Sequence, residues 1–102
     1  MGFKVVTKAI AYADLDEAIS WYENEAPGLG ERFFLKVEEA KNRIAERPMS
    51  FSYIKKPVRR CMVDKFPYKI LFIITGDVVF ILGICHTKRS NAFVRRRLKL
   101  ME

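Results

Sequence analysis

The sequence contains few of the residues that bind metals or form disulfide bonds, with one histidine and two cysteines among 102 residues. Cys61 and Cys85 are separated far beyond the spacing of paired metal ligands. His86 alone cannot form a multi-histidine site or a histidine-based acid–base couple. We therefore expect no metal site, no other cofactor and no disulfide, and we interpret both cysteines as small buried hydrophobic residues.

Long apolar runs are also absent. The longest candidate, residues 70–85, is interrupted by Thr75-Gly76-Asp77, whereas a membrane span requires about 20 apolar residues. Lys4 and Lys8 interrupt the N-terminal apolar stretch, which lacks the core and the cleavage site of a signal peptide. These features predict a cytoplasmic protein with no membrane partner. The length predicts one domain over residues 1–102.

Acidic residues are scarce in the second half of the chain. Residues 1–54 carry seven basic and nine acidic side chains, residues 55–102 carry twelve basic and three acidic ones, and the whole chain has a net charge of +7. This asymmetry is not needed for folding, but it influences which partners a protein attracts. It favours a polyanion or an acidic protein segment as partner, and the alternative is a solvated basic face without a partner.

The basic residues flank two apolar runs, residues 70–74 and 78–85. If these runs pair as a hairpin, the entry of one strand and the exit of the other lie side by side, so the charges converge on one end of a sheet. Arg59 and Arg60 should point to opposite faces of their strand, so only one of them can join this site. The candidate binding residues are Lys55, Lys56, Arg59, Arg60, Lys69, His86, Lys88, Arg89, Arg95 and Arg96.

The first half predicts a strand and two helices. Residues 3–10 are rich in β-branched side chains, which is typical of a strand. Asp14 and Glu17 form a capping-box pattern, which predicts that a helix starts there. Pro27-Gly28 ends this helix, and a second helix follows over residues 30–46. Two helices joined by so short a turn should form an antiparallel hairpin.

The second half predicts three strands, over residues 58–64, 68–74 and 78–86. The short turns at Phe66-Pro67 and Gly76-Asp77 require antiparallel neighbours, which gives a three-stranded meander. Residues 91–101 should form a short basic helix or tail at the sheet edge. Because helices and strands are segregated along the chain, we expect an α+β fold with the helix hairpin packed on one face of the sheet.

Several short motifs, in this order and at these spacings, resemble the ParE branch of the RelE/ParE superfamily, the toxins of bacterial type II toxin–antitoxin systems. The likeness covers residues 3–96. It is carried by Asp14-Leu15, Glu17-Ala18-Ile19, Trp21-Tyr22-Glu23, Pro27-Gly28-Leu29-Gly30, Phe33, Ile44, Pro48, Val58-Arg59-Arg60, Phe66-Pro67-Tyr68, His86 and Arg89. The resemblance implies a toxin that inhibits growth by acting on DNA gyrase. It also implies a cognate acidic antitoxin as partner, in a possible hetero-oligomer.

The resemblance leaves a second activity open, because RelE-like members cut messenger RNA on the ribosome with basic side chains. Carried over to this sequence, the catalytic candidates are Arg60, Lys69 and Arg89, with Lys88 as an alternative to Arg89. The terminal tyrosine of those enzymes corresponds here to Phe93 or Val94, and neither has a hydroxyl group. This favours gyrase inhibition. A basic nucleic-acid-binding module and a non-toxic scaffold remain further alternatives.

Overall fold

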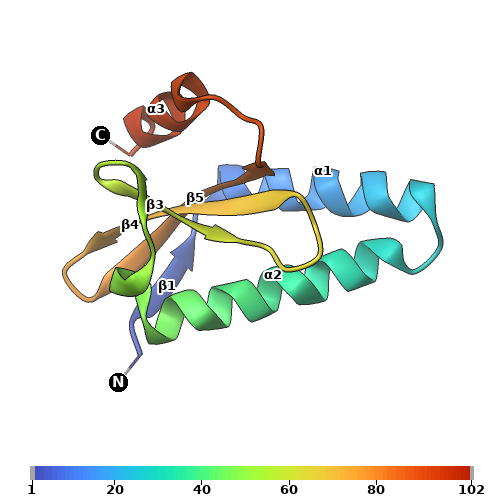
Figure 1. The fold of residues 1–102 in the computed structure, drawn as a ribbon, viewed down its shortest axis with the longest axis horizontal. Helices are drawn as coiled ribbons and strands as arrows, with labels where there is room; N and C mark the ends of the chain where they lie inside the picture. Colours follow the sequence, from blue (N-terminus) through green and yellow to red (C-terminus); the bar gives the residue numbers. More distant parts are fainter. Residues whose placement is uncertain (1, 102) are drawn as a thin grey trace.

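The computed structural model describes residues 2–101 and contains a five-stranded mixed sheet in the order β1-β5-β4-β3-β2. The elements are β1 (Lys4–Thr7), α1 (Ala9–Glu25), α2 (Leu29–Glu46), the 3₁₀ helix η1 (Pro48–Ser50), β2 (Tyr53–Lys55), β3 (Val58–Met62), β4 (Tyr68–Thr75), β5 (Val78–His86) and α3 (Asn91–Lys99). Figure 1 shows this arrangement. The predicted α+β class, helix hairpin and antiparallel meander β3-β4-β5 are confirmed. Two pairings were not predicted: β1 joins β5 in parallel, and the short β2 extends the other edge.

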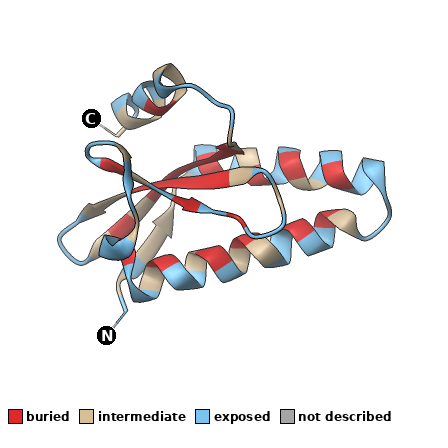
Figure 2. Ribbon diagram, in the orientation of Figure 1, coloured by how far each residue is buried: buried red, intermediate tan, exposed pale blue. Residues whose placement is uncertain are grey.

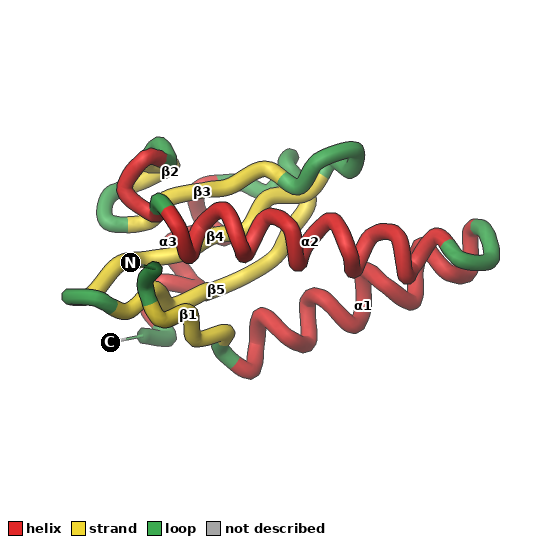
Figure 3. Tube along the Cα trace, turned by 90° about the horizontal axis from the view of Figure 1, so that it is seen from below, coloured by secondary structure: helices red, strands yellow, loops and turns green. Residues whose placement is uncertain are grey.

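The helices α1 and α2 form the predicted antiparallel hairpin and cover one face of the sheet, as the view from below shows (Figure 3). Their apolar stripes meet the sheet, where Leu15, Tyr22, Phe33 and Val37 are buried. Between the helices, Gly28 has a φ of 86°, a left-handed conformation that glycine adopts readily.

A carboxylate closes the turn between the two helices. Glu23 accepts hydrogen bonds from the backbone N–H groups of Gly28 at 2.9 Å and Gly30 at 3.0 Å. These groups lie at the start of α2, where backbone donors lack partners within the helix. Glu23 therefore caps α2 and fixes the angle between the helices.

The predicted boundary between the first strand and the first helix is wrong. The strand ends at Thr7, and α1 begins at Ala9, so Asp14 lies inside the helix and does not cap it. The carbonyl of Lys8 accepts the first helical bond, from the N–H of Tyr12 at 3.1 Å. Residues 9–13 contain three alanines, the strongest helix formers, and these extend the helix beyond the expected start.

The sheet is buried on both faces, which Figure 2 shows as red strands between the helices. Ile70, Phe72 and Ile81 pack against α1 and α2 in the larger core. On the other face, Leu71 and Leu82 pack with Val94 of α3. The C-terminal segment is therefore a helix, as one of the two predicted forms, but it packs on a face of the sheet and not at its edge.

No helix within residues 2–101 is long and apolar enough to cross a membrane. Cys61 and Cys85 are both buried and unpaired, with 1% and 5% of their surfaces exposed, and each lies in a different core.

Candidate basic surface and groove

The strand register brings part of the basic set together. Tyr68 pairs with His86 and Lys69 with Cys85, so the start of β4 and the end of β5 lie side by side as expected for the hairpin. Beyond β5, Lys88 and Arg89 are exposed in the connection to α3. Arg95 and Arg96 are exposed on α3 itself.

The remaining basic residues lie on β2, β3 and the turn between them. Lys55, Lys56 and Arg60 are exposed. Arg60 pairs with Leu71, two positions along β4 from Lys69, and therefore shares the sheet face of Lys69 and α3. The candidate residues thus form two groups, one from the end of β5 to α3 and one on β2, β3 and the turn between them. Arg60 and Lys69 lie on the sheet face that α3 covers, whereas His86, which pairs with Tyr68, lies on the face of α1 and α2.

Arg59 points to the opposite face and is engaged within the protein. Its guanidinium donates to the carbonyls of Phe51 at 2.7 Å and Met49 at 3.2 Å, and to the hydroxyl of Tyr53 at 2.9 Å. The same group lies 4.1 Å from the centre of the Tyr53 ring. Arg59 holds the segment after η1 against β3.

Lys69 is buried, with 3% of its surface exposed. Its ammonium group donates to the carbonyls of Thr87 and Arg89, each at 3.3 Å. A buried ammonium requires such partners because leaving it unpaired in an apolar environment is costly. In this conformation Lys69 fastens the connection between β5 and α3.

His86 lies at the end of β5, and one of its ring nitrogens forms a hydrogen bond with the backbone two residues later. Its Nδ1 accepts from the N–H of Lys88 at 3.1 Å, and its ring centre lies 5.7 Å from that of Tyr68. In the neutral ring the proton is then on Nε2, which is left as a donor.

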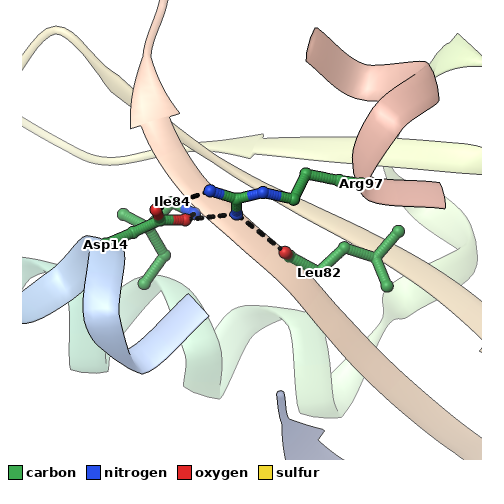
Figure 4. A network of polar contacts seen from close by, with 4 residues as sticks. All are labelled: Asp14, Leu82, Ile84 and Arg97. Atoms are coloured by element: carbon green, nitrogen blue, oxygen red, sulfur yellow. Dashed lines mark hydrogen bonds and ion pairs between the residues drawn. The ribbon is translucent and has the colours of Figure 1, made fainter. Parts of the chain in front are cut away.

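An ion pair that the sequence analysis did not identify connects α3 to α1 (Figure 4). Arg97 Nη1 lies 2.6 Å from Asp14 Oδ2, and Arg97 Nη2 lies 2.8 Å from Asp14 Oδ1. Asp14 also accepts from the N–H of Ile84 at 3.0 Å, and Arg97 donates to the carbonyl of Leu82 at 3.1 Å. The hydrogen bond to Asp14 raises the pKa of Arg97, so the guanidinium remains charged.

This ion pair supplies hydrogen-bond partners to backbone groups at the free edge of β5. The parallel partner β1 covers β5 only as far as Ile81. Beyond it, the carbonyl of Leu82 and the N–H of Ile84 would lack a strand partner, and the two charged side chains take its place. Gly83 leaves the space for them, because a Cβ there would lie 2.7 Å from Arg97 Nη1.

A groove of about 830 Å³ opens beside this ion pair, between α1, the end of β5 and the start of α3. Besides Asp14 and Arg97, its walls include Glu17, Trp21, Tyr68, His86, Arg89 and Phe93. Of these, the sequence analysis selected only His86 and Arg89 as binding residues. The spacing of Asp14, Glu17 and Trp21 along one stripe of α1 was the available signal, because positions three, four and seven apart share a helix face.

The pKa shifts near the groove follow from burial. Burial raises the pKa of the Cys85 thiol to about 11, so this cysteine is uncharged at neutral pH. Burial also raises the pKa of Tyr68; the Glu17 carboxylate adds to this increase, while the Arg89 guanidinium opposes it.

Comparisons with known proteins place the fold. No protein-family model matches the sequence, and no curated protein is significantly similar to it. Several solved structures do match. The chromosomal ParDE toxin–antitoxin system of P. aeruginosa gives a TM-score of 0.74 at 18% identity, covering 82% of this chain and 95% of that chain.

The RelBE2 toxin–antitoxin complex of Mycobacterium tuberculosis gives a TM-score of 0.60 at 17% identity, covering 84% of this chain and 99% of that one. A mutant of the E. coli toxin RelE in the free state, with two arginines replaced by alanine, gives 0.66 at 12% identity, covering 94% and 98%. The fold that the sequence resemblance predicted is confirmed: the chain shares its fold with these three structures.

Proposed function

We propose that this protein is the toxin of a type II toxin–antitoxin system, that it inhibits growth by acting on DNA gyrase, and that an acidic antitoxin neutralises it. The observation that carries the proposal is the similarity to the ParDE system over 82% of the chain, at a TM-score of 0.74. The corresponding scores for RelBE2 and RelE are 0.60 and 0.66.

The charge distribution supports an acidic polypeptide as partner. Lys88, Arg89, Arg95 and Arg96 are exposed along one continuous stretch, from the end of β5 through α3. An antitoxin segment that is disordered alone could order on this surface, and complementary charge would speed the encounter and fix its orientation. The predicted contacts are salt-sensitive because these side chains face solvent.

Two features favour gyrase over messenger RNA as the target. Phe93 has no hydroxyl group, and Val94 is 1% exposed, so neither supplies a phenol to an RNA-cleaving site. The Lys69 ammonium is held by two carbonyl groups and would have to leave them to reach a phosphate. A gyrase inhibitor needs a binding surface and no hydrolytic site.

Two assays on the purified chain separate the alternatives. In the first, gyrase and supercoiled plasmid are incubated with the protein, and supercoiling and cleaved DNA are followed. In the second, a cell-free translation reaction receives the same concentration and its messenger RNA is analysed. We expect loss of gyrase activity with intact translation. Cleaved messenger RNA with unaffected gyrase would replace the proposal by the RelE-type activity, and no effect in either assay would favour the scaffold alternative.

The contribution of the basic surface is tested with exposed residues only. Arg60→Ala and Arg89→Ala should weaken gyrase inhibition, and Lys4→Ala, an exposed change on β1, is the matched control. All three variants should retain the circular dichroism spectrum of the parent. Full inhibition by the Arg60→Ala/Arg89→Ala double variant would remove the assigned role of these side chains.

A further inference from the structure

The groove beside the Asp14–Arg97 pair is lined by several side chains whose polar atoms have no hydrogen-bond partner within residues 2–101. Within residues 2–101, the side chains of Glu17, Trp21, Tyr68 and Arg89 form no hydrogen bond and no ion pair. Asp14 and Arg97, in contrast, have all their charge engaged with each other and with β5. Four side chains whose polar atoms lack a hydrogen-bond or ion-pair partner line one groove, which is typical of a binding site.

The groove combines aromatic surface with charges of both signs. The rings of Trp21 and Tyr22 are nearly perpendicular, with their planes at 85° and their centres 5.1 Å apart. Trp21 is 56% exposed, so much of its indole surface is accessible to a ligand. Arg89 lies over the Phe93 ring at 5.0 Å. Glu17, Tyr68 and Arg89 line the same groove, so a carboxylate and a guanidinium lie in one site.

These features match the parts of a nucleotide. Aromatic faces stack on bases of any kind. An arginine guanidinium binds a phosphate through paired N–H donors. A carboxylate accepts hydrogen bonds, and guanine is the base that presents two adjacent donors, N1–H and the N2 amino group, on one edge. The volume of about 830 Å³ lies within the range of small-molecule sites.

We propose that this groove binds a guanine nucleotide. The base stacks on Trp21, the Glu17 carboxylate accepts from its N1–H and N2 amino groups, and Arg89 binds the phosphate. The guanine is either a free nucleotide or a base of a single-stranded nucleic acid, because both present the same edge, face and phosphate. This site lies on the α1 side of β5 and is additional to the gyrase-directed function proposed above.

Trp21 provides the measurement, because it is the only tryptophan in the chain and lines the groove. We would titrate the intact protein with guanosine, adenosine, cytidine and uridine monophosphates and with inorganic phosphate, following Trp21 fluorescence and confirming affinities by calorimetry. Guanosine monophosphate should bind at least about tenfold more tightly than the others, since a two-bond contact to one base edge discriminates by about 1–3 kcal/mol.

Two variants assign the contacts. Glu17→Gln should remove the preference for guanine, because an amide offers one acceptor oxygen and places a donor beside it. Arg89→Ala should weaken the guanosine and adenosine nucleotides equally, by about tenfold, because it removes the phosphate contact. Lys4→Ala, exposed on β1 outside the groove, is the control and should leave every affinity unchanged. Thermal melts establish that each variant is folded.

The source of the guanine is tested with two oligouridines that differ by one central guanosine. Tighter binding of the guanosine-containing strand than of the mononucleotide, with competition between them, supports a nucleic acid as ligand. Equal or weaker binding of the strand supports the free nucleotide. The proposal is overturned if guanosine monophosphate binds no more tightly than adenosine monophosphate or inorganic phosphate, or if Glu17→Gln keeps the preference. Gyrase inhibition is measured separately, so either proposal can fail alone.

Discussion

Arg97 and Asp14 are 83 residues apart in the sequence, yet they form a two-point ion pair, with contacts of 2.6 and 2.8 Å. Their side chains are 12% and 17% exposed. The pair joins α3 to α1 and completes the edge of β5 where no strand covers it. The Asp14 carboxylate in the first helix therefore helps to hold the C-terminal helix in position.

Removing one member of this pair should destabilise the protein strongly. Arg97→Met leaves the Asp14 carboxylate buried without its cation, and such losses cost about 3–5 kcal/mol for a fully buried pair. We expect a loss near the lower end of that range, measured by urea unfolding, with faster amide exchange in α3. Replacing both residues, as Asp14→Leu/Arg97→Met, should recover part of the loss. Arg95→Ala is the exposed control, and a similar loss in that variant would contradict the account.

Gly83→Ala should disturb the same ion pair from the β5 backbone. The added Cβ would lie 2.7 Å from Arg97 Nη1 and 3.3 Å from Asp14 Oδ2, so the guanidinium must move. We expect a loss of about 1–3 kcal/mol, the range for inserting a methyl group into a well-packed site. A double-mutant cycle with Arg97→Ala checks the cause. If the two losses simply add, the glycine is required for another reason.

Lys69→Met tests whether this lysine acts in the fold. The ammonium donates to two carbonyls of the segment that leads into α3. Hydrogen bonds to charged groups contribute about 1.5–3 kcal/mol each, and the substitution should lower stability by an amount in this range because the methionine regains some packing. It should also increase amide exchange in residues 87–90. Arg60→Ala is the matched exposed change, and unchanged stability in Lys69→Met would refute the assigned role.

Stability should fall at alkaline pH. Burial raises the pKa of Cys85 from 9.0 to about 11, so the folded protein retains a thiol proton that the unfolded chain has lost. The resulting stability is complete below pH 9.0 and disappears as the pH rises to about 11. The raised pKa values of Cys61, Tyr22 and Tyr68 act in the same direction. Urea midpoints measured across this range should decrease less steeply in Cys85→Ala, and an equal slope would exclude Cys85 as a contributor.

The sequence predicted correctly those elements that are determined by residues close together in the chain. The Pro27-Gly28 turn, the apolar stripe of α2 and the short turns of the meander are determined by residues close together in the chain. The parallel pairing of β1 with β5 joins segments at the two ends of the sequence and has no local signal. The three-residue β2 is too short to show alternation.

The candidate site was predicted from charge, and charge alone did not distinguish exposed from buried cations. Arg59, Arg60 and Lys69 are all basic residues of predicted strands, and only the contacts of the folded chain show that Arg59 and Lys69 are engaged. Asp14 was interpreted as a helix cap because Glu17 follows three residues later, the spacing of a capping box. Gly83 lies inside an apolar strand, and a glycine at such a position indicates that other groups approach the strand closely.

The most direct test of the central claim is the viable count of a bacterial culture after this chain is induced alone, and after it is induced together with a candidate acidic antitoxin. The account predicts a large loss of colonies with the chain alone, with DNA damage signalling before protein synthesis declines, and normal growth when both are produced. Undiminished growth with the chain alone, at an expression level confirmed by immunoblot, would contradict the toxin assignment.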